Sequence, residues 1–411
     1  MSPNLQAVSA CEPNCSIRTA SNDVPTTALS RPVKLRHLLL LFLIAACSDP
    51  TSPADDGTPV NVSLGAPSTV PLLAASAERI YTLRGVDANS IVVESRSLKG
   101  SSRWKVTLPS CQDACFLAVD ANDNLYVATA TDTRSLSGET GAVRWTAPIR
   151  GALVALGSNG RVYIGSRPFA VPQRVHALSA ATGEVIWITT VLPSLDVTAL
   201  LVDEFKSSLY AIGRGRISTL NLASGTVQTT TVAACFGGSQ GAIAADGTIY
   251  VTCDNDMSSR LFAYEPGGPS KWITFLGATS GTSAPVIGAN GMIYVANSGS
   301  LTALHPNGSI AWQLNGLSHN DVSPAVGSNN DVYIHAAQAP SASPSLLVVN
   351  EGVVIEDKGP VGCALAFLVT AKGQVFCGAS GGFAFFQGRN TDLTGQWTQL
   401  GSNSARGSRK P

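Results

Sequence analysis

A unit of about 42 residues recurs along this chain, and it constrains the fold more than any other feature. Each unit has an aromatic residue after its first turn, at Tyr81, Tyr126, Tyr163, Tyr210, Tyr250, Tyr294, Tyr333 and Phe376. The last strand expected in most units carries a tryptophan, at Trp104, Trp145, Trp187, Trp272, Trp312 and Trp397. Successive tryptophans lie one period apart, except for two intervals, Trp187 to Trp272 and Trp312 to Trp397, that each cover two periods. The two missing tryptophans fall near Thr229 and Glu356.

Residues 288–313 form the clearest unit, with three short apolar runs separated by turn residues. Asn290-Gly291 is a hairpin signal, because both central residues of a two-residue turn need a positive φ. With the run 283–287 just upstream, each unit predicts four short strands. Eight copies between about residue 68 and residue 400 predict an all-β fold, an eight-bladed β-propeller with four antiparallel strands per blade.

The N-terminal region contains a predicted export signal. Residues 1–30 show no periodicity, and a basic segment then precedes the apolar run 38–46, as in a secretory signal peptide. A run of this length cannot cross a bilayer as a helix, which needs about 20 residues. The sequence LIAAC at 43–47 resembles a bacterial lipobox, which implies that Cys47 is lipidated and becomes the mature N-terminus. An ordinary signal peptide is the alternative, and the late signal suggests that Val33 is the true start.

The chain therefore divides into four predicted parts. Residues 1–46 are an N-terminal extension plus signal peptide, and 47–66 are a flexible tether rich in Pro, Asp and Ser. Residues 67–400 are the eight-bladed propeller, and 401–411 are a polar tail. Whether residues 60–64 add an edge strand to the propeller is left open by the sequence.

The repeat also resembles a known family. Residues 177–187, ALSAATGEVIW, are similar to the tryptophan-docking repeat of PQQ-binding-like propellers, roughly A-x-D-x-x-T-G-x-x-x-W. Residues 135–145 match with Ser in place of Ala, and 263–272 and 303–312 match with one residue fewer. The resemblance implies that each tryptophan packs between neighbouring blades, over a small residue and a glycine. A buried indole would supply a large contact area there.

That family includes quinoprotein dehydrogenases and non-catalytic scaffold lipoproteins. The enzymes use two adjacent cysteines beside the quinone, and none of the nine cysteines here is adjacent to another. We therefore expect no catalytic residue, no cofactor and no metal site. The resemblance favours a lipid-anchored binding or scaffold module for a protein or glycan partner at the cell envelope, with the outer membrane favoured. A periplasmic quinoprotein-like oxidoreductase remains the alternative.

Charge and cysteine content restrict the classes of partner and the cellular compartment that we expect. With 27 basic and 27 acidic side chains, the chain lacks the basic excess that nucleic-acid binding needs, and we expect a monomer. Cysteines of an exported protein predict disulfides. The expected pairs are Cys235–Cys253, Cys363–Cys377 and Cys111–Cys115. Each pair flanks a turn or closes a loop, and metal binding is the alternative interpretation.

Two short motifs match catalytic or metal-binding patterns but fall at turn positions of the repeat. Residues 378–382, GASGG, fit the G-x-S-x-G pattern, which needs a strand followed by a helix. Residues 120–124, DANDN, begin like a calcium loop but lack the glycine and glutamate that such a loop requires. Both are predicted to be turns.

Overall fold

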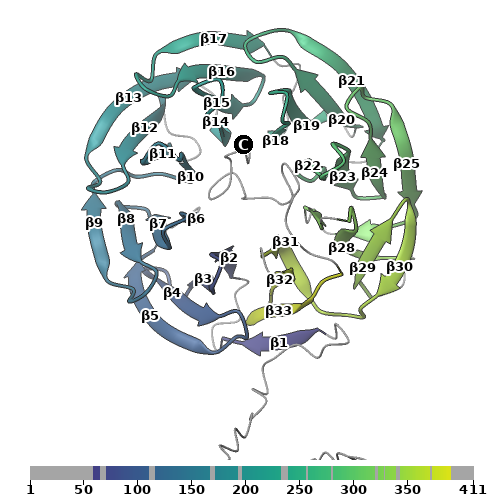
Figure 1. The fold of residues 1–411 in the computed structure, drawn as a ribbon, viewed down its shortest axis with the longest axis horizontal. Helices are drawn as coiled ribbons and strands as arrows, with labels where there is room; N and C mark the ends of the chain where they lie inside the picture. The colour runs from purple at the N-terminus through teal and green to yellow at the C-terminus, as the bar shows by residue number, and fades with distance from the viewer. Residues whose placement is uncertain are drawn as a thin grey trace, which may run out of the picture. The chain divides into compact units, whose positions relative to one another are not determined.

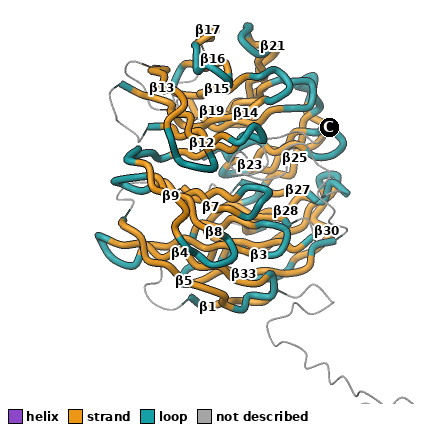
Figure 2. The backbone as a smooth tube through the Cα atoms, turned by 60° about the vertical axis from the view of Figure 1, so that its left-hand side comes forward, coloured by secondary structure: helices purple, strands orange, loops and turns teal. Residues whose placement is uncertain are grey.

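In a computed structural model, the chain separates into two units, Met1–Pro50 and Thr51–Pro411. The described residues all lie in the second unit, and they are 59–64, 71–110, 116–166, 172–192, 197–232, 239–255, 258–278, 281–319, 323–327, 329–338, 343–370 and 373–389. They contain strands and turns and no helix (Figure 2). Within this described part, no segment forms a helix long and apolar enough to cross a membrane.

The strands form eight antiparallel sheets arranged as the blades of a ring (Figure 1). Blades one to four contain β2 (Leu72–Ala75), β3 (Arg79–Gly85), β4 (Ser90–Ser97), β5 (Ser102–Pro109); β6 (Phe116–Val119), β7 (Asn124–Ala128), β8 (Thr133–Ser137), β9 (Val143–Ala147); β10 (Leu153–Leu156), β11 (Arg161–Gly165), β12 (Gln173–Ser179), β13 (Val185–Leu192); β14 (Val197–Asp203), β15 (Ser208–Gly213), β16 (Arg216–Asn221) and β17 (Val227–Val232). Blades five to eight contain β18 (Ser239–Ile243), β19 (Ile249–Asn255), β20 (Ser258–Tyr264), β21 (Ser270–Gly277); β22 (Val286–Ile287), β23 (Ile293–Asn297), β24 (Ser300–Leu304), β25 (Ile310–Asn315); β26 (Ser318–His319), β27 (Ala325–Val326), β28 (Val332–Ala337), β29 (Ser345–Asn350), β30 (Val353–Asp357); β31 (Cys363–Val369), β32 (Gln374–Ala379), β33 (Gly382–Gln387) and β1 (Val60–Ser63). The predicted all-β, eight-bladed propeller with four antiparallel strands per blade is confirmed, and in blade seven the innermost strand is split into β26 and β27.

Burial follows strand position within each blade. The second strand is buried on both faces, as in β15, because neighbouring blades cover it from both sides. The outermost strand alternates between exposed and partly buried residues, as in β25, because solvent reaches one side. The aromatic residue of each repeat falls on the second strand, and its ring is fully buried at Tyr81, Tyr126, Tyr163, Tyr210, Tyr250, Tyr333 and Phe376.

The N-terminal strand β1 closes the ring. It pairs antiparallel with β33, with Val60 opposite Phe385 and Ser63 opposite Gly382. Figure 1 shows β1 at the outer edge of blade eight, the place that the outermost strand takes in every other blade. The propeller therefore begins before the predicted boundary at residue 67, and part of the predicted tether is a strand of the ring.

Candidate functional site

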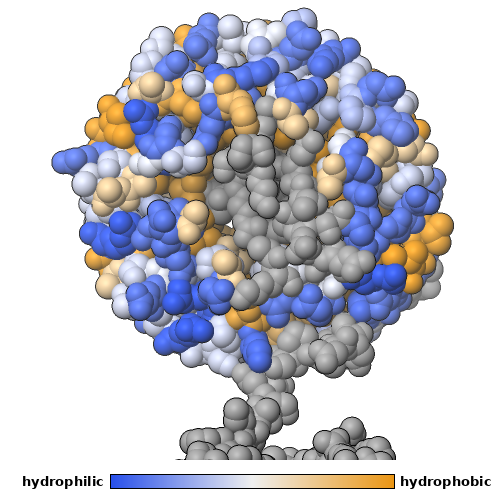
Figure 3. Space-filling view, in the orientation of Figure 1, coloured by the Kyte–Doolittle hydropathy of each residue, from blue (hydrophilic) through white to orange (hydrophobic). Residues whose placement is uncertain are grey.

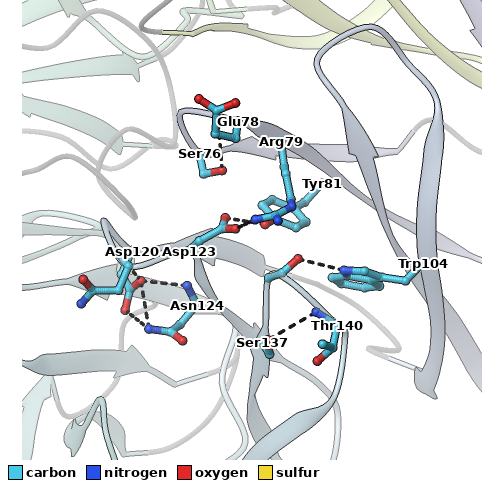
Figure 4. Close-up of polar contacts among 12 residues, drawn as sticks. Ser76, Glu78, Arg79, Tyr81, Trp104, Asp120, Asp123, Asn124, Ser137 and Thr140 are labelled. Atoms are coloured by element: carbon cyan, nitrogen blue, oxygen red, sulfur yellow. Dashed lines mark hydrogen bonds and ion pairs between the residues drawn. The ribbon is translucent and has the colours of Figure 1, made fainter.

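At seven of the eight junctions between consecutive blades, an outer-strand side chain lies on a glycine of the next blade. The indole of Trp104 donates from Nε1 to the Gly138 carbonyl at 2.8 Å, as Figure 4 shows. The same bond joins Trp145 to Ala180, Trp187 to Leu222 and Trp272 to Pro306, at 3.0, 3.2 and 3.0 Å. At Gly183, φ is +76°, and an added Cβ would lie 2.6 Å from Trp145 Cε3, so no larger residue fits without displacing the ring.

Of the two units that lack a tryptophan, unit four keeps this geometry with a smaller side chain. Thr229 occupies the corresponding position of β17 and lies against Gly267, 2.9 Å from where a Cβ would be. A threonine covers far less of the next blade than an indole, so the junction between blades four and five has less buried apolar area. Trp397 lies outside the described residues, and β1 holds the outer-strand place of its blade.

Polar side chains add to the junction of blades one and two. The Asp123 carboxylate pairs with the Arg79 guanidinium and accepts a hydrogen bond from the Tyr81 hydroxyl (Figure 4). Burial and this bond to a carboxylate raise the pKa of Tyr81 above its ordinary value. The phenol therefore stays protonated at neutral pH and acts as a donor that holds two blades together, rather than as a base.

A groove of about 350 Å³ lies between blades two and three, at the end where their first turns lie. The Asp120 carboxylate lines it and accepts hydrogen bonds from the Asn124 backbone amide and the Tyr126 hydroxyl, both at 2.8 Å. The Arg144 guanidinium contacts Ser135 Oγ at 3.0 Å, and that of Arg161 contacts the carbonyl of Ala223 at 2.9 Å. The fold already supplies hydrogen-bond partners for these charged groups. They are therefore better suited to form a polar contact surface than to transfer protons.

A second groove, of about 390 Å³, lies between blades five and six and is lined by no ionisable side chain among the described residues. Phe275 and Ile310 supply apolar surface, and their side chains are 56% and 45% exposed. The side-chain amide of Gln313 in blade six donates to the Leu276 carbonyl of blade five at 3.2 Å. This hydrogen bond joins the two blades within the groove. Such a lining provides apolar contact and amide hydrogen bonds without the groups that acid–base chemistry needs.

The outer strands of blades three to six continue this low-charge character. Strands β13, β17, β21 and β25 together carry one charged side chain, Lys271. Large apolar residues on them face solvent, with Ile188 53% and Val232 75% exposed. Apolar residues exposed in this way on neighbouring strands are typical of protein contact surfaces. Figure 3 shows hydrophobic residues at several places along this edge of the ring, among hydrophilic ones.

The structure describes some of the cysteines that the sequence singled out and not others. Cys363 and Cys377 form a disulfide with a Cα–Cα distance of 5.5 Å, and an irregular stretch between Cys363 and Phe367 brings the two sulfurs together. Cys253 is also disulfide-bonded, while Cys235, the partner predicted for it, lies outside the described residues. Also outside them are Cys47, Cys111 and Cys115.

The motifs with catalytic or metal-binding patterns are turns. Ala379 pairs with Gly382 across a tight hairpin between β32 and β33, so the G-x-S-x-G segment is followed by a strand. The Asp120 side chain caps its own turn by accepting from the backbone amide of Asn122 at 2.9 Å. Among the described residues, no group of three or more His, Cys, Asp and Glu side chains is arranged to hold a metal ion.

Comparison with known proteins supports the class of fold. The family model described as outer membrane protein assembly factor BamB matches residues 88–242. The crystal structure of BamB from Moraxella catarrhalis has a TM-score of 0.51 at 15% identity, covering 82% of this chain and 95% of that one. The computationally designed Ika8 protein has a TM-score of 0.61 at 13% identity, covering 81% and 100%. At these identities the two structures share the fold alone, and no curated protein matches the chain. The chain is a β-propeller built from PQQ-like repeats.

The sequence singled out the junction tryptophans and the cysteines but not the two grooves. Each groove combines residues from two blades, about one repeat apart in the chain, for example Asp120 with Arg161 and Phe275 with Gln313. A signal does exist in the aligned repeats, because the groove residues Arg144 and Gln313 occupy outer-strand positions where charge and polarity differ between units.

Proposed function

We propose that this protein is an exported lipoprotein whose propeller binds or scaffolds a protein partner at the cell envelope, with the outer membrane favoured. A lipid on Cys47 would be its only membrane attachment, and the ring would work as a monomer. The observation that carries the proposal is the match of residues 88–242 to the model described as outer membrane protein assembly factor BamB.

Two features of this chain support a protein rather than a glycan as the partner. The groove between blades five and six is lined by uncharged polar and apolar side chains, and the outer strands beside it carry one charged residue, Lys271. Interfaces between proteins are depleted of charge in the same way at their centres. Disulfide bonding at Cys253, Cys363 and Cys377 suits an oxidising compartment outside the cytoplasm.

Lipidation is tested by acyl labelling and membrane fractionation of wild type and Cys47→Ser. We expect labelled wild-type protein in the membrane fraction and an unlabelled, released variant, because several acyl chains are needed for stable anchoring. Wild-type protein that is unlabelled and wholly soluble would reject the anchor.

The partner is tested with a photo-crosslinking amino acid placed singly at Phe275, at Ser158 and at Asp87 in the intact protein. Phe275 and Ser158 line the two grooves, whereas Asp87 lies on an exposed turn of blade one and serves as the control. We expect one discrete protein adduct from Phe275 and none from Asp87. Equal labelling from all three positions, or adducts that polysaccharide-degrading enzymes remove, would contradict binding of a protein partner at this surface.

A further inference from the structure

The junction between blades eight and one, which we call the seam, is where the two ends of the propeller meet. Val62 of β1 lies on Gly100 of blade one, at the place where most other junctions have an indole. Directly after β1, the Leu64 amide donates to the Gly381 carbonyl of blade eight at 2.8 Å. The Leu64 carbonyl accepts from the Arg84 guanidinium of blade one at 3.1 Å. This short strand and one arginine therefore join the two blades.

The face of blade one that lies against the seam carries buried charge. Side chains alternate along a strand, and Tyr81 of β3 bonds to blade two, so the next residue, Thr82, faces blade eight. Glu94 lies opposite Thr82 and is 1% exposed. Its carboxylate forms an ion pair with Arg96 at 2.7 Å and a longer one with Lys105 at 3.5 Å. A buried ion pair of blade one thus faces the seam.

The position of Arg96 is apolar or aromatic in the other seven blades. It follows the third-strand residue that pairs with the aromatic residue of the second strand, and it packs toward the preceding blade. The residues at this position are Leu136, Leu178, Leu220, Tyr264, Leu304, Val349 and Phe386, and all seven are buried. Blade one therefore departs from the pattern at the junction where the ring closes.

Polar atoms in the seam are also incompletely bonded. The Gln374 amide donates to the Leu98 carbonyl across the seam at 3.2 Å. Among the described residues, Gln374 Oε1 and Arg96 Nε are buried and have no hydrogen-bond partner. Burial of such atoms, and of an ion pair, costs hydration free energy that is regained when water reaches them. The apolar faces of other junctions, by contrast, lose free energy when water reaches them.

We propose that the seam is a latch, at which the ring opens reversibly while the blades themselves stay folded. Hydration of Glu94 and Arg96 offsets part of the cost of parting the two blades, and the apolar cluster that contains Ile80 and Phe385 closes them again. β1 is the first described strand after Cys47, so tension on a lipid anchor would reach the latch before any other strand. That consequence rests on the proposed lipid at Cys47, whereas the opening itself does not.

Thiol labelling of the full chain under native conditions tests the latch. Thr82→Cys places a thiol of similar size in the seam, where Thr82 is 1% exposed. Ser218→Cys is the matched control, because Ser218 is buried and donates to the Val191 carbonyl at the junction of blades three and four, which has an indole. Both substitutions are made in one chain, so global unfolding exposes both thiols equally. We expect a soluble maleimide to modify residue 82 at least about tenfold faster than residue 218, measured by mass spectrometry of the two peptides.

The role of the charges is tested by giving blade one the apolar pair of blade seven, Leu347 and Val349. In Glu94→Leu/Arg96→Val, labelling of residue 82 should slow toward the rate at residue 218. Equal rates at the two positions without this change would overturn the latch, whether or not the apolar variant folds. Labelling of residue 82 that the apolar pair leaves unchanged or accelerates would also overturn the proposal. So would an apolar variant that does not fold, because the proposal holds that the charges weaken this junction.

Discussion

Replacement of Trp187 by alanine tests whether docked indoles hold the blades together. The Trp187 side chain is 9% exposed, lies on Gly225 and donates to the Leu222 carbonyl at 3.2 Å. Its ring also packs at 5.8 Å from that of Tyr163 in its own blade. Alanine would remove these contacts and leave a cavity between blades three and four. The Leu222 carbonyl would also lose its hydrogen-bond donor. Substitutions of this kind cost about 3–5 kcal/mol.

The expected shift in melting temperature follows from the size of the ring. At about 2.1 cal/mol/K per residue, a ring of roughly 330 residues has an unfolding entropy near 0.7 kcal/mol/K. A loss of about 4 kcal/mol then lowers the thermal midpoint by about 6 °C, measured by circular dichroism or calorimetry. Ile188→Ala is the matched control, because Ile188 is the next residue of the same strand and is 53% exposed. It should change the free energy of unfolding by no more than about 0.5 kcal/mol. An unchanged midpoint for Trp187→Ala, or equal shifts for both variants, would refute this account of the junctions.

Blade four should exchange amide hydrogens faster than blades three and five, because Thr229 replaces the indole at its junction, and uniform protection in exchange mass spectrometry would contradict this. Non-reducing peptide mapping of the exported protein should recover Cys363 linked to Cys377, and free thiols at both positions would reject the bond. Burial lowers the pKa of His335, so the unfolded chain binds a proton more readily and stability should fall as pH drops below about 6.5. Denaturant titrations from about pH 7.5 to about pH 5 should show a smaller loss for His335→Leu, and identical pH profiles would count against the buried neutral imidazole.

The sequence predicted the ring because its strongest signals are local and repeated. The aromatic residue on each second strand and the tryptophan on most outer strands indicate the same blade geometry. Eight copies of a weak pattern therefore support one predicted fold. Ring closure was not predictable in this way, because β1 is short and has no repeat of its own with which to align. Trp397 keeps the period of the outer strands, but β1 holds the edge on which such a strand would pair.

The grooves were beyond sequence reasoning for a different reason. Their linings depend on the angle between two neighbouring blades. The repeat determines the spacing of residues within one blade, but it determines the angle between blades less firmly. Tyr81 illustrates the limit. Its place on a second strand was predictable, whereas its bond to Asp123 of the next blade was not, since the other repeats do not share that pair.

Pairing of β1 with β33 also bears on how the protein is made. Val60 and Phe385 lie opposite each other although, of the strands that the structure describes, one belongs to the first and the other to the last. Contacts this distant in sequence form late and slow folding, because a long loop must close before they contribute. A chain that is synthesised from its N-terminus must therefore keep β1 unpaired until the last blade has emerged. During that interval β1 has no partner strand, and a chaperone that shields unpaired strands would be needed most at this stage.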